Sequence, residues 1–258
     1  MNNTDIQNLL VRRGKEIFNA LASFIPFTKN KAADELINDL AHHPHAFVLA
    51  SIMDRQIKAD RAWIIPHKLQ EKLGDFKMTT LTKLSKADIQ DLLSKPESLH
   101  RFVDIMAGCL YDGIQRIENQ YDSVASKIWM DKPSSASVVY RFLEFNGIGP
   151  KIACMNANIL ARDFKIKLSD YYSIDISADV HVRRVFTRLG LVPEQASVEQ
   201  LVYRARGLYP DFPGIMDLPT WEIGRSWCKP KDPNCQACYM REVCPSSKTI
   251  GSNISLYR

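Results

Sequence analysis

The segment from Phe145 to Ala153 reads Phe-Asn-Gly-Ile-Gly-Pro-Lys-Ile-Ala and constrains the fold more than any other part of the chain. Gly147 and Gly149 allow a tight turn with positive φ, and Pro150 favours a helix start because its missing N–H would be unpaired there. We therefore expect one helix to end at Phe145 and a second to begin at Pro150. Free N–H groups at that second start would bind an anion, although an ordinary turn between helices has the same pattern.

Most of the remaining chain is also helical in character. Apolar residues recur every three or four positions, and alternating strand patterns are nearly absent outside residues 165–176. We therefore expect an all-α fold. The expected helices start at Thr4 or Asp5 and continue at 32–40, 45–69, 99–110, 114–129 and 135–145, with Ser85 and Asp88 as a capping pair before another.

Composition and charge exclude some classes of protein. A hydrophobic content of 45% and a charged content of 24% are those of an ordinary globular chain, and no apolar run is long enough to span a membrane. The formal net charge is +5, and residues 151–258 hold 15 basic against 11 acidic residues. This excess permits a polyanionic partner, although solvated surface charge explains it equally well.

The N-terminal segment indicates a compartment. Its apolar residues are interrupted by Arg12, Arg13 and Lys15, which is typical of an amphipathic helix and not of an export signal. We therefore expect a cytoplasmic protein, associated with the nucleoid if the source is a prokaryote. In a reducing compartment the six cysteines do not form a disulfide framework, and we expect Cys109 and Cys154 to be buried thiols.

Asp179 stands directly before a helical apolar face in the phrase Ala-Asp-Val-His-Val-Arg-Arg-Val. At a helix N-cap its carboxylate would accept backbone N–H bonds, which keep a carboxylate ionised. An ionised carboxylate stabilises positive charge on a sugar, or accepts a proton from an attacking amine or water. A simple capping role explains the same residue.

Four cysteines form a compact group near the C-terminus: Cys228, Cys235, Cys238 and Cys244, with the spacing C-x6-C-x2-C-x5-C. Structural zinc sites usually pair two close Cys-x-x-Cys knuckles, or one knuckle with two histidines. Only one knuckle occurs here, and no histidine follows Cys244. Four thiolates in one loop suit a 4Fe-4S cluster, with zinc as the alternative.

Together these features resemble the helix-hairpin-helix DNA glycosylases, in particular the endonuclease III-like branch. The hairpin phrase is similar to that family's Leu-Pro-Gly-Val-Gly-x-Lys-x-Ala, except that Phe145-Asn146 replaces Leu-Pro. The phrase around Asp179 looks like the family's Val-Asp-Thr-His-Val-x-Arg-Val, and the cysteine spacing matches its iron–sulfur loop. The resemblance covers residues from about 30 to 246.

The resemblance implies two helical domains. A six-helix barrel would span residues 30–160 and include the helix-hairpin-helix at about 135–160, and residues 1–29 with 161–258 would form the iron–sulfur cluster domain. It also implies roles for Lys151 as a Schiff-base nucleophile, Asp179 as the catalytic aspartate, Gln56 as a side chain that fills the gap left by a flipped base, and Gly147 and Gly149 as DNA contacts. The start of a helix disfavours a charged ammonium group and partial burial would act in the same direction, so a neutral amine is easier to reach at Lys151. A polar residue at a helix end, and a lysine that contacts phosphate or solvent, are the plain alternatives for Gln56 and Lys151.

The activity implied is base-excision repair by a monomer acting on double-stranded DNA that contains a damaged base. The enzyme would be a DNA N-glycosylase with AP lyase activity, with oxidised pyrimidines as the default substrates. A monofunctional glycosylase for alkylated or mismatched bases, using water activated by Asp179, is one alternative. A non-catalytic DNA-binding lesion sensor is another.

Two departures bear on the substrate. No carboxylate occurs at residues 50–53, which argues against adenine excision as adenine-mismatch enzymes perform it. The 27 residues between Lys151 and Asp179 exceed the same interval in endonuclease III-like enzymes. The surplus falls in residues 163–172, where we expect a longer loop that shapes the base pocket.

Overall fold

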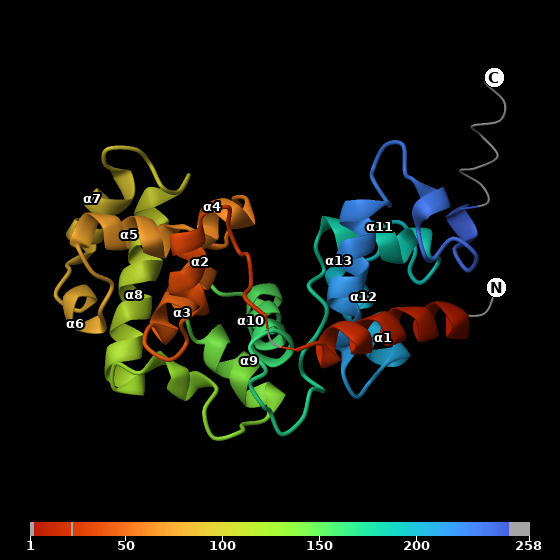
Figure 1. The fold of residues 1–258 in the computed structure, drawn as a ribbon, viewed down its shortest axis with the longest axis horizontal. Helices are drawn as coiled ribbons and strands as arrows, with labels where there is room; N and C mark the ends of the chain where they lie inside the picture. Colours follow the sequence, from red (N-terminus) through yellow and green to blue (C-terminus); the bar gives the residue numbers. More distant parts are fainter. Residues whose placement is uncertain (1–2, 22, 248–258) are drawn as a thin grey trace. The chain divides into compact units, whose positions relative to one another are not determined.

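The computed structural model describes residues 3–21 and 23–247, and no described residue lies in a β-strand (Figure 1). The expected all-α fold is therefore confirmed, and residues 165–176 are irregular. None of the described helices is long and apolar enough to cross a membrane. The helices are α1 (Asn3–Asn19), α2 (Lys31–Asn38), α3 (Pro44–Met53), α4 (Ala59–Trp63), α5 (Ile65–Leu73), α6 (Met78–Leu81), α7 (Lys86–Ser94), α8 (Val103–Tyr121), η1 (Ala125–Ile128), α9 (Ser135–Leu143), α10 (Pro150–Arg162), α11 (Val180–Arg188), α12 (Val198–Leu208), η2 (Pro213–Met216), α13 (Asp217–Ser226) and η3 (Cys235–Ala237).

The chain divides into two compact units, which we name after a helix in each. The α3 unit contains Ala22–Pro133 and Ser137–Asn156, and the α13 unit contains Met1–Leu21, Ser134–Ala136 and Ala157–Arg258. The α3 unit begins at Ala22 and ends at Asn156, whereas the sequence predicted a domain from 30 to 160, so both predicted boundaries lie a few residues later in the chain.

Helix α3 forms the centre of the α3 unit. Its ten residues are apolar on nearly all sides, and all of them are buried, which suits a helix covered by neighbours all round. Helices α2, α4, α5 and α8 pack on it. The single helix predicted at 45–69 is wrong, because α3 ends at Met53 and Gln56 adopts a φ of 56°, which a right-handed helix cannot contain.

Helix α8 replaces two predicted helices. The segments 99–110 and 114–129 form one helix that ends at Tyr121, followed by the short η1. Gly113 lies inside this helix and does not interrupt it. A Cβ on Gly113 would lie only 2.6 Å from Cδ1 of Ile52, so the glycine lets α8 approach α3 closely. The capping pair is confirmed, since Ser85 and Asp88 hydrogen-bond to each other's backbone N–H at the start of α7.

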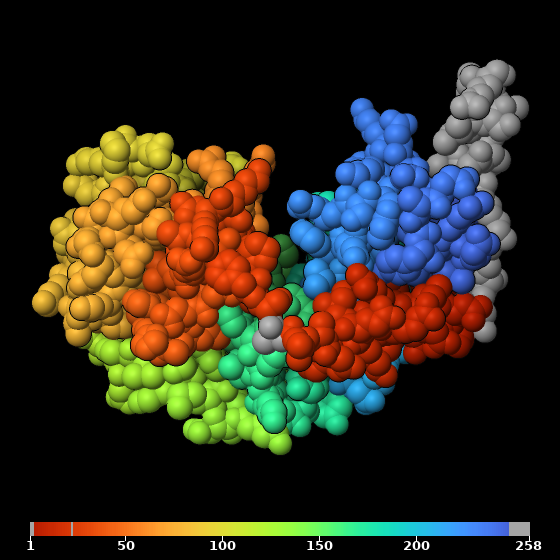
Figure 2. All heavy atoms as spheres, viewed as in Figure 1, coloured from red at the N-terminus to blue at the C-terminus, as the bar shows by residue number. Residues whose placement is uncertain are grey.

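The α13 unit is built on the packing of α11 against α13. Helix α1 packs against α13 and against η2, and it lies on the face of the unit that Figure 2 shows. Gly14 faces the Ile215 carbonyl so closely that any Cβ would clash, and Arg13 pairs with Glu222 at 2.8 Å. Helix α1 begins at Asn3, so Thr4 and Asp5 lie inside it and do not cap it.

The surplus stretch 163–172 lies against α1 and η2. Lys165 donates a hydrogen bond to the Phe18 carbonyl at 2.6 Å, and the Tyr171 ring stacks on Phe212 with centroids 4.9 Å apart. Asp170 accepts a hydrogen bond from the Ser135 side chain. These contacts brace the N-terminal helix, and a role in shaping a base pocket stays a prediction.

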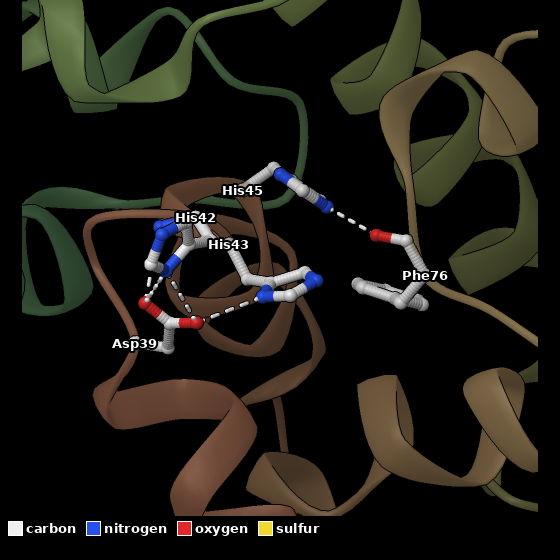
Figure 3. Close-up of polar contacts among 5 residues, drawn as sticks. All are labelled: Asp39, His42, His43, His45 and Phe76. Atoms are coloured by element: carbon white, nitrogen blue, oxygen red, sulfur yellow. Dashed lines mark hydrogen bonds and ion pairs between the residues drawn. The ribbon is translucent and has the colours of Figure 1, made fainter.

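A histidine cluster follows α2 (Figure 3). Asp39 accepts hydrogen bonds from Nδ1 of His42 at 2.9 Å and Nδ1 of His43 at 3.1 Å. Burial raises the pKa of Asp39, but the backbone N–H of His42, which donates to Oδ1 at 3.0 Å, and then the two histidine rings outweigh burial and hold the pKa below its ordinary value. Three histidines directly before an apolar helix predict a surface turn. This prediction is wrong for His45, which is 4% exposed and whose Nε2 donates to the Phe76 carbonyl at 2.6 Å.

Acid is expected to destabilise the protein through His45, because burial lowers the pKa of this histidine from 6.5 to about 4. Below pH 6.5 the unfolded chain takes up a proton at His45 that the folded protein does not bind. Stability is therefore fully present above pH 6.5 and falls towards pH 4, by up to about 3 kcal/mol. Urea unfolding of wild type and His45→Gln across this range measures the slope, with His42→Gln as the matched surface control. Equal slopes in wild type and His45→Gln would contradict the assignment.

Candidate active site

The hairpin between α9 and α10 is built as its sequence predicts. Gly147 has a φ of 94°, and a Cβ there would lie 3.2 Å from Sγ of Cys109, so both conformation and space require glycine. Ile148 is buried at 6% exposure and anchors the turn, whereas nothing lies within 4 Å of a Cβ built on Gly149. The open side at Gly149 leaves the N–H groups at the start of α10 accessible to an anion.

Lys151 is the second residue of α10, at the start of the helix as expected, and it is exposed. Its positive charge acts on Asp54, a carboxyl group directly after α3 in the same unit. Burial raises the pKa of Asp54, while the positive charge of Lys151 and a hydrogen bond from the Trp63 side chain oppose that rise. The hairpin amine therefore has a carboxyl group within electrostatic reach.

Asp179 caps α11 as predicted. Its Oδ1 accepts the backbone N–H groups of His181 and Val182, both at 2.8 Å. No other described residue donates a hydrogen bond to its second oxygen, Oδ2, and the side chain is partly exposed. One oxygen is thus fixed by the helix start, and the other is available to a substrate or a proton. Lys151 lies in the α3 unit and Asp179 in the α13 unit, and their joint action stays a prediction.

A second carboxyl group, Asp217, is associated with the segment before Asp179. Asp217 is the first residue of α13, and its Oδ1 accepts the Ser177 N–H at 2.6 Å. The residue as a whole is partly exposed, but its carboxyl group is enclosed, and this burial raises its pKa to about 6. The positive charge of Arg162 opposes the rise and the negative charge of Asp179 adds to it.

Gln56 lies on the border of a basic groove in the α3 unit. The groove also contains Lys58, Arg61 and Arg101, and no carboxylate lines it. Gln56 is exposed and holds its positive φ between α3 and α4, a conformation that non-glycine residues rarely adopt outside strained or functional positions. Gln56 is therefore an exposed residue beside the positively charged side chains of this groove.

The four cysteines Cys228, Cys235, Cys238 and Cys244 line one pocket of the α13 unit. All four are free thiols, and burial raises the pKa of Cys238 and of Cys244. Within the described residues, no group of three or more His, Cys, Asp or Glu side chains is close enough to hold a single metal ion. The donor set consists of four thiols, which both iron–sulfur clusters and structural zinc sites use.

Helix α11 also carries contacts to the cysteine loop. Arg184 donates to the carbonyl oxygens of Cys228 at 2.7 Å and Gly224 at 2.9 Å. Arg188 donates to Sγ of Cys228 at 3.3 Å and to the Lys229 carbonyl at 2.7 Å. The predicted buried thiols Cys109 and Cys154 are confirmed at 2% and 4% exposure.

Sequence reasoning named Asp54 only as a possible pocket residue and did not single out Asp217 as a site residue. Asp54 carried a weak signal, because it directly follows the apolar run that forms α3. Asp217 carried none beyond its place at a helix start, since its partner Ser177 lies 40 residues earlier in the chain.

Comparison with curated proteins gives partial matches, and no protein-family model matches the chain. DNA glycosylase/AP lyase ROS1 of Arabidopsis thaliana is 26% identical over 180 residues, which cover 61% of this chain and 12% of that protein. Endonuclease III of Thermotoga maritima is 32% identical over 69 residues, or 27% of this chain and 32% of that protein. The matches therefore span a minor part of each relative's length.

Comparison with solved structures covers nearly the whole chain. A trapped covalent intermediate of endonuclease III with DNA matches with a TM-score of 0.61 at 16% identity, over 97% of this chain and 100% of that one. A thermostable thymine-DNA glycosylase matches with a TM-score of 0.63 at 15% identity, over 96% and 99%. The chain therefore has the helical fold of the helix-hairpin-helix glycosylases. Within that group its solved neighbours include endonuclease III, as the sequence resemblance implied.

Proposed function

We propose that the protein is a DNA N-glycosylase that removes a damaged base from duplex DNA. The observation that carries this proposal is Asp179, whose Oδ1 is held by two helix N–H groups while Oδ2 stays available. A fixed, ionised carboxylate stabilises the positive charge that develops on a sugar as its glycosidic bond breaks. The names of its relatives, a DNA glycosylase/AP lyase and an endonuclease III, support the same class of reaction.

Lys151 is the nucleophile in this proposal. Its amine nitrogen bonds to the sugar C1′ as the bond from C1′ to the base breaks, and the base leaves with the bonding electrons. Asp179 takes the proton that the amine loses. Opening of the sugar ring then gives a Schiff base between Lys151 and C1′, from which β-elimination of the 3′ phosphate cleaves the strand. The same residue therefore supplies both glycosylase and AP lyase activity.

Two surfaces of the α3 unit suit DNA. The accessible helix start behind Gly149 favours a backbone phosphate, because free N–H groups and the helix dipole attract anions. The groove with Lys58, Arg61 and Arg101 offers further cations for phosphates, and Gln56 stands beside it to occupy the space of a flipped nucleotide. Neither surface requires a particular base, so neither identifies the lesion.

The cysteine pocket is proposed to hold a 4Fe-4S cluster through Cys228, Cys235, Cys238 and Cys244. A bound cluster would supply a rigid, electron-active brace for the loop. Protein purified without oxygen is expected to contain about four iron atoms per chain and to absorb in the visible range. Replacing Cys238 by Ser should lower the iron content, whereas Cys154→Ser, in the core of the α3 unit, should not. One zinc per chain in place of iron would contradict the cluster.

A monofunctional glycosylase is the second candidate, and the exposure of Lys151 favours it. In that reaction Asp179 would take a proton from water, and the water oxygen would bond to C1′ in place of the amine. The base leaves in the same way, but no Schiff base forms and the strand stays intact.

A lesion panel tests the proposed function. Duplex oligonucleotides that each carry one thymine glycol, 5-hydroxyuracil, uracil, 8-oxoguanine, alkylated adenine or G·T mismatch are incubated with excess protein, and released base is measured. We expect release from at least one lesion and none from the undamaged duplex. Binding without release from any lesion would instead indicate a non-catalytic lesion sensor.

A further inference from the structure

The chain that leads into Asp179 is held at successive points by side chains and backbone of the α13 unit. The Gly214 N–H donates to the Ile174 carbonyl at 2.7 Å, and a Cβ on Gly214 would lie 2.7 Å from Cγ2 of Ile174. Arg206 of α12 pairs with both oxygens of Asp175, each at 2.8 Å. Residues 174 and 175 therefore have two anchors, one from η2 and one from α12.

Asp217 supplies the anchor nearest to Asp179. Its Oδ1 accepts the Ser177 N–H at 2.6 Å, and the Ser177 carbonyl in turn accepts the Asp179 N–H at 2.5 Å. Only Ala178 stands between this anchored residue and the aspartate that caps α11. A shift of Asp217 would therefore move the backbone of Asp179 directly.

We propose that Asp217 is a positioning residue for base excision, which holds Asp179 in its working place through the Ser177 N–H. This inference rests on the proposed function, because it assigns Asp217 a part in the reaction of Asp179. It adds a second carboxyl group to the site, acting through the backbone and not by contact with the substrate.

The ionised carboxyl group of Asp217 lowers the stability of the fold, so stability alone does not explain an aspartate at this position. A carboxyl group whose pKa is raised to about 6 by burial costs stability once it is ionised, so at neutral pH the charge works against the fold. An amide would accept the same Ser177 N–H without that cost. The ionised form has a different advantage, because hydrogen bonds to a charged acceptor are stronger and shorter, and they fix the donor more firmly.

The charged groups on the elements around Asp217 are largely paired, and on α11 Arg184 donates to the Gly224 carbonyl of α13 and to His181. Arg162 at the end of α10 and Asp179 at the start of α11 act on Asp217 directly. On α1, Arg13 is paired with Glu222 of α13, and on α12, Arg206 is paired with Asp175. Arg162 is itself paired with Asp163 at 2.6 Å.

The test uses the full chain and two variants of Asp217 in single-turnover base release, on the lesion that the panel shows to be released fastest. Asp217→Ala removes the acceptor, and we expect a rate at pH 7.5 about 10- to 100-fold below wild type. Binding to a duplex with a tetrahydrofuran abasic analogue should stay within about 3-fold, because Asp217 does not touch DNA. Asp217→Asn keeps an uncharged acceptor for the Ser177 N–H, as the protonated carboxyl group does, so its rate should lie between those of Asp217→Ala and wild type at pH 7.5.

The pH profile separates positioning from plain folding. The wild-type rate should fall as the pH drops through about 6, where Asp217 takes up its proton, and Asp217→Asn should lose this step. Glu222→Gln, which changes one charge on the same helix, is the matched control and should keep the wild-type profile. Circular dichroism and melting curves check that each variant is folded.

Two outcomes would overturn the inference. One is a folded Asp217→Asn with the same acid limb as wild type, while Asp179→Asn is inactive, which leaves the proposed function standing. The other is a folded Asp217→Ala with the wild-type rate. A wild type that releases no base at any pH would instead overturn the proposed function, and this inference with it.

Discussion

Asp179→Asn is expected to slow base release about 100- to 10,000-fold, the range that loss of a general acid–base or charge-stabilising group produces. Asparagine caps helices as well as aspartate does, so the variant keeps an acceptor for the N–H groups of His181 and Val182 and should fold normally. What it loses is the negative charge that faces the sugar and the ability to take a proton. Single-turnover release of the base measures the loss.

Asp88→Asn is the matched control for this experiment. Asp88 is also an aspartate at a helix start with capping hydrogen bonds, but it belongs to α7, away from any residue of the site. It should release base at the wild-type rate. If Asp179→Asn were folded and as active as wild type, Asp179 would be a cap and nothing more, and the proposed function would lose the observation that carries it.

Lys151→Ala is expected to abolish covalent trapping on DNA. Borohydride reduces a Schiff base to a stable amine, so wild type incubated with a duplex that contains an abasic site should give a protein–DNA adduct on a denaturing gel. Without the Lys151 amine no adduct should form and strand cleavage should stop. Lys83→Ala removes an equally exposed lysine of the α3 unit and should trap like wild type.

The trapping result also decides between the two candidate reactions. An adduct that persists in Lys151→Ala would show that another amine is the nucleophile. A wild type that releases base but gives no adduct would favour attack by water, with Asp179 as the base. Since Lys151 is exposed, its side chain has room to reach a sugar, and the experiment tests whether it does so.

The parts of the site that depend on local backbone geometry could be predicted from the sequence. The glycine turn at Gly147 and the N-cap at Asp179 each depend on residues within a few positions, so the sequence contains all the needed information. The capping pair of Ser85 and Asp88 is the same kind of feature. The all-α fold was predictable for a related reason, since helical periodicity is local.

The sequence predictions failed where the structure depends on contacts with residues far away in the sequence. Separate helices were predicted at 99–110 and 114–129, yet Gly113 lies inside the single helix α8, where it permits close contact with Ile52. His45 was assigned to a surface turn together with His42 and His43, but a carbonyl 31 residues later accepts its N–H in the core. Asp217 was overlooked for the same reason, because its partner Ser177 belongs to a different segment of the chain.

The contacts of α1 have a consequence for the order of folding during synthesis. Helix α1 emerges first, but its partners come much later: Gln7 bonds to the Leu208 carbonyl and Arg13 pairs with Glu222. Almost all of the α3 unit comes from residues 22–156 and can assemble while the rest is still being translated. The N-terminal helix must wait through that interval with its apolar face uncovered. A ribosome-associated chaperone that shields short amphipathic segments would therefore raise the yield of folded protein.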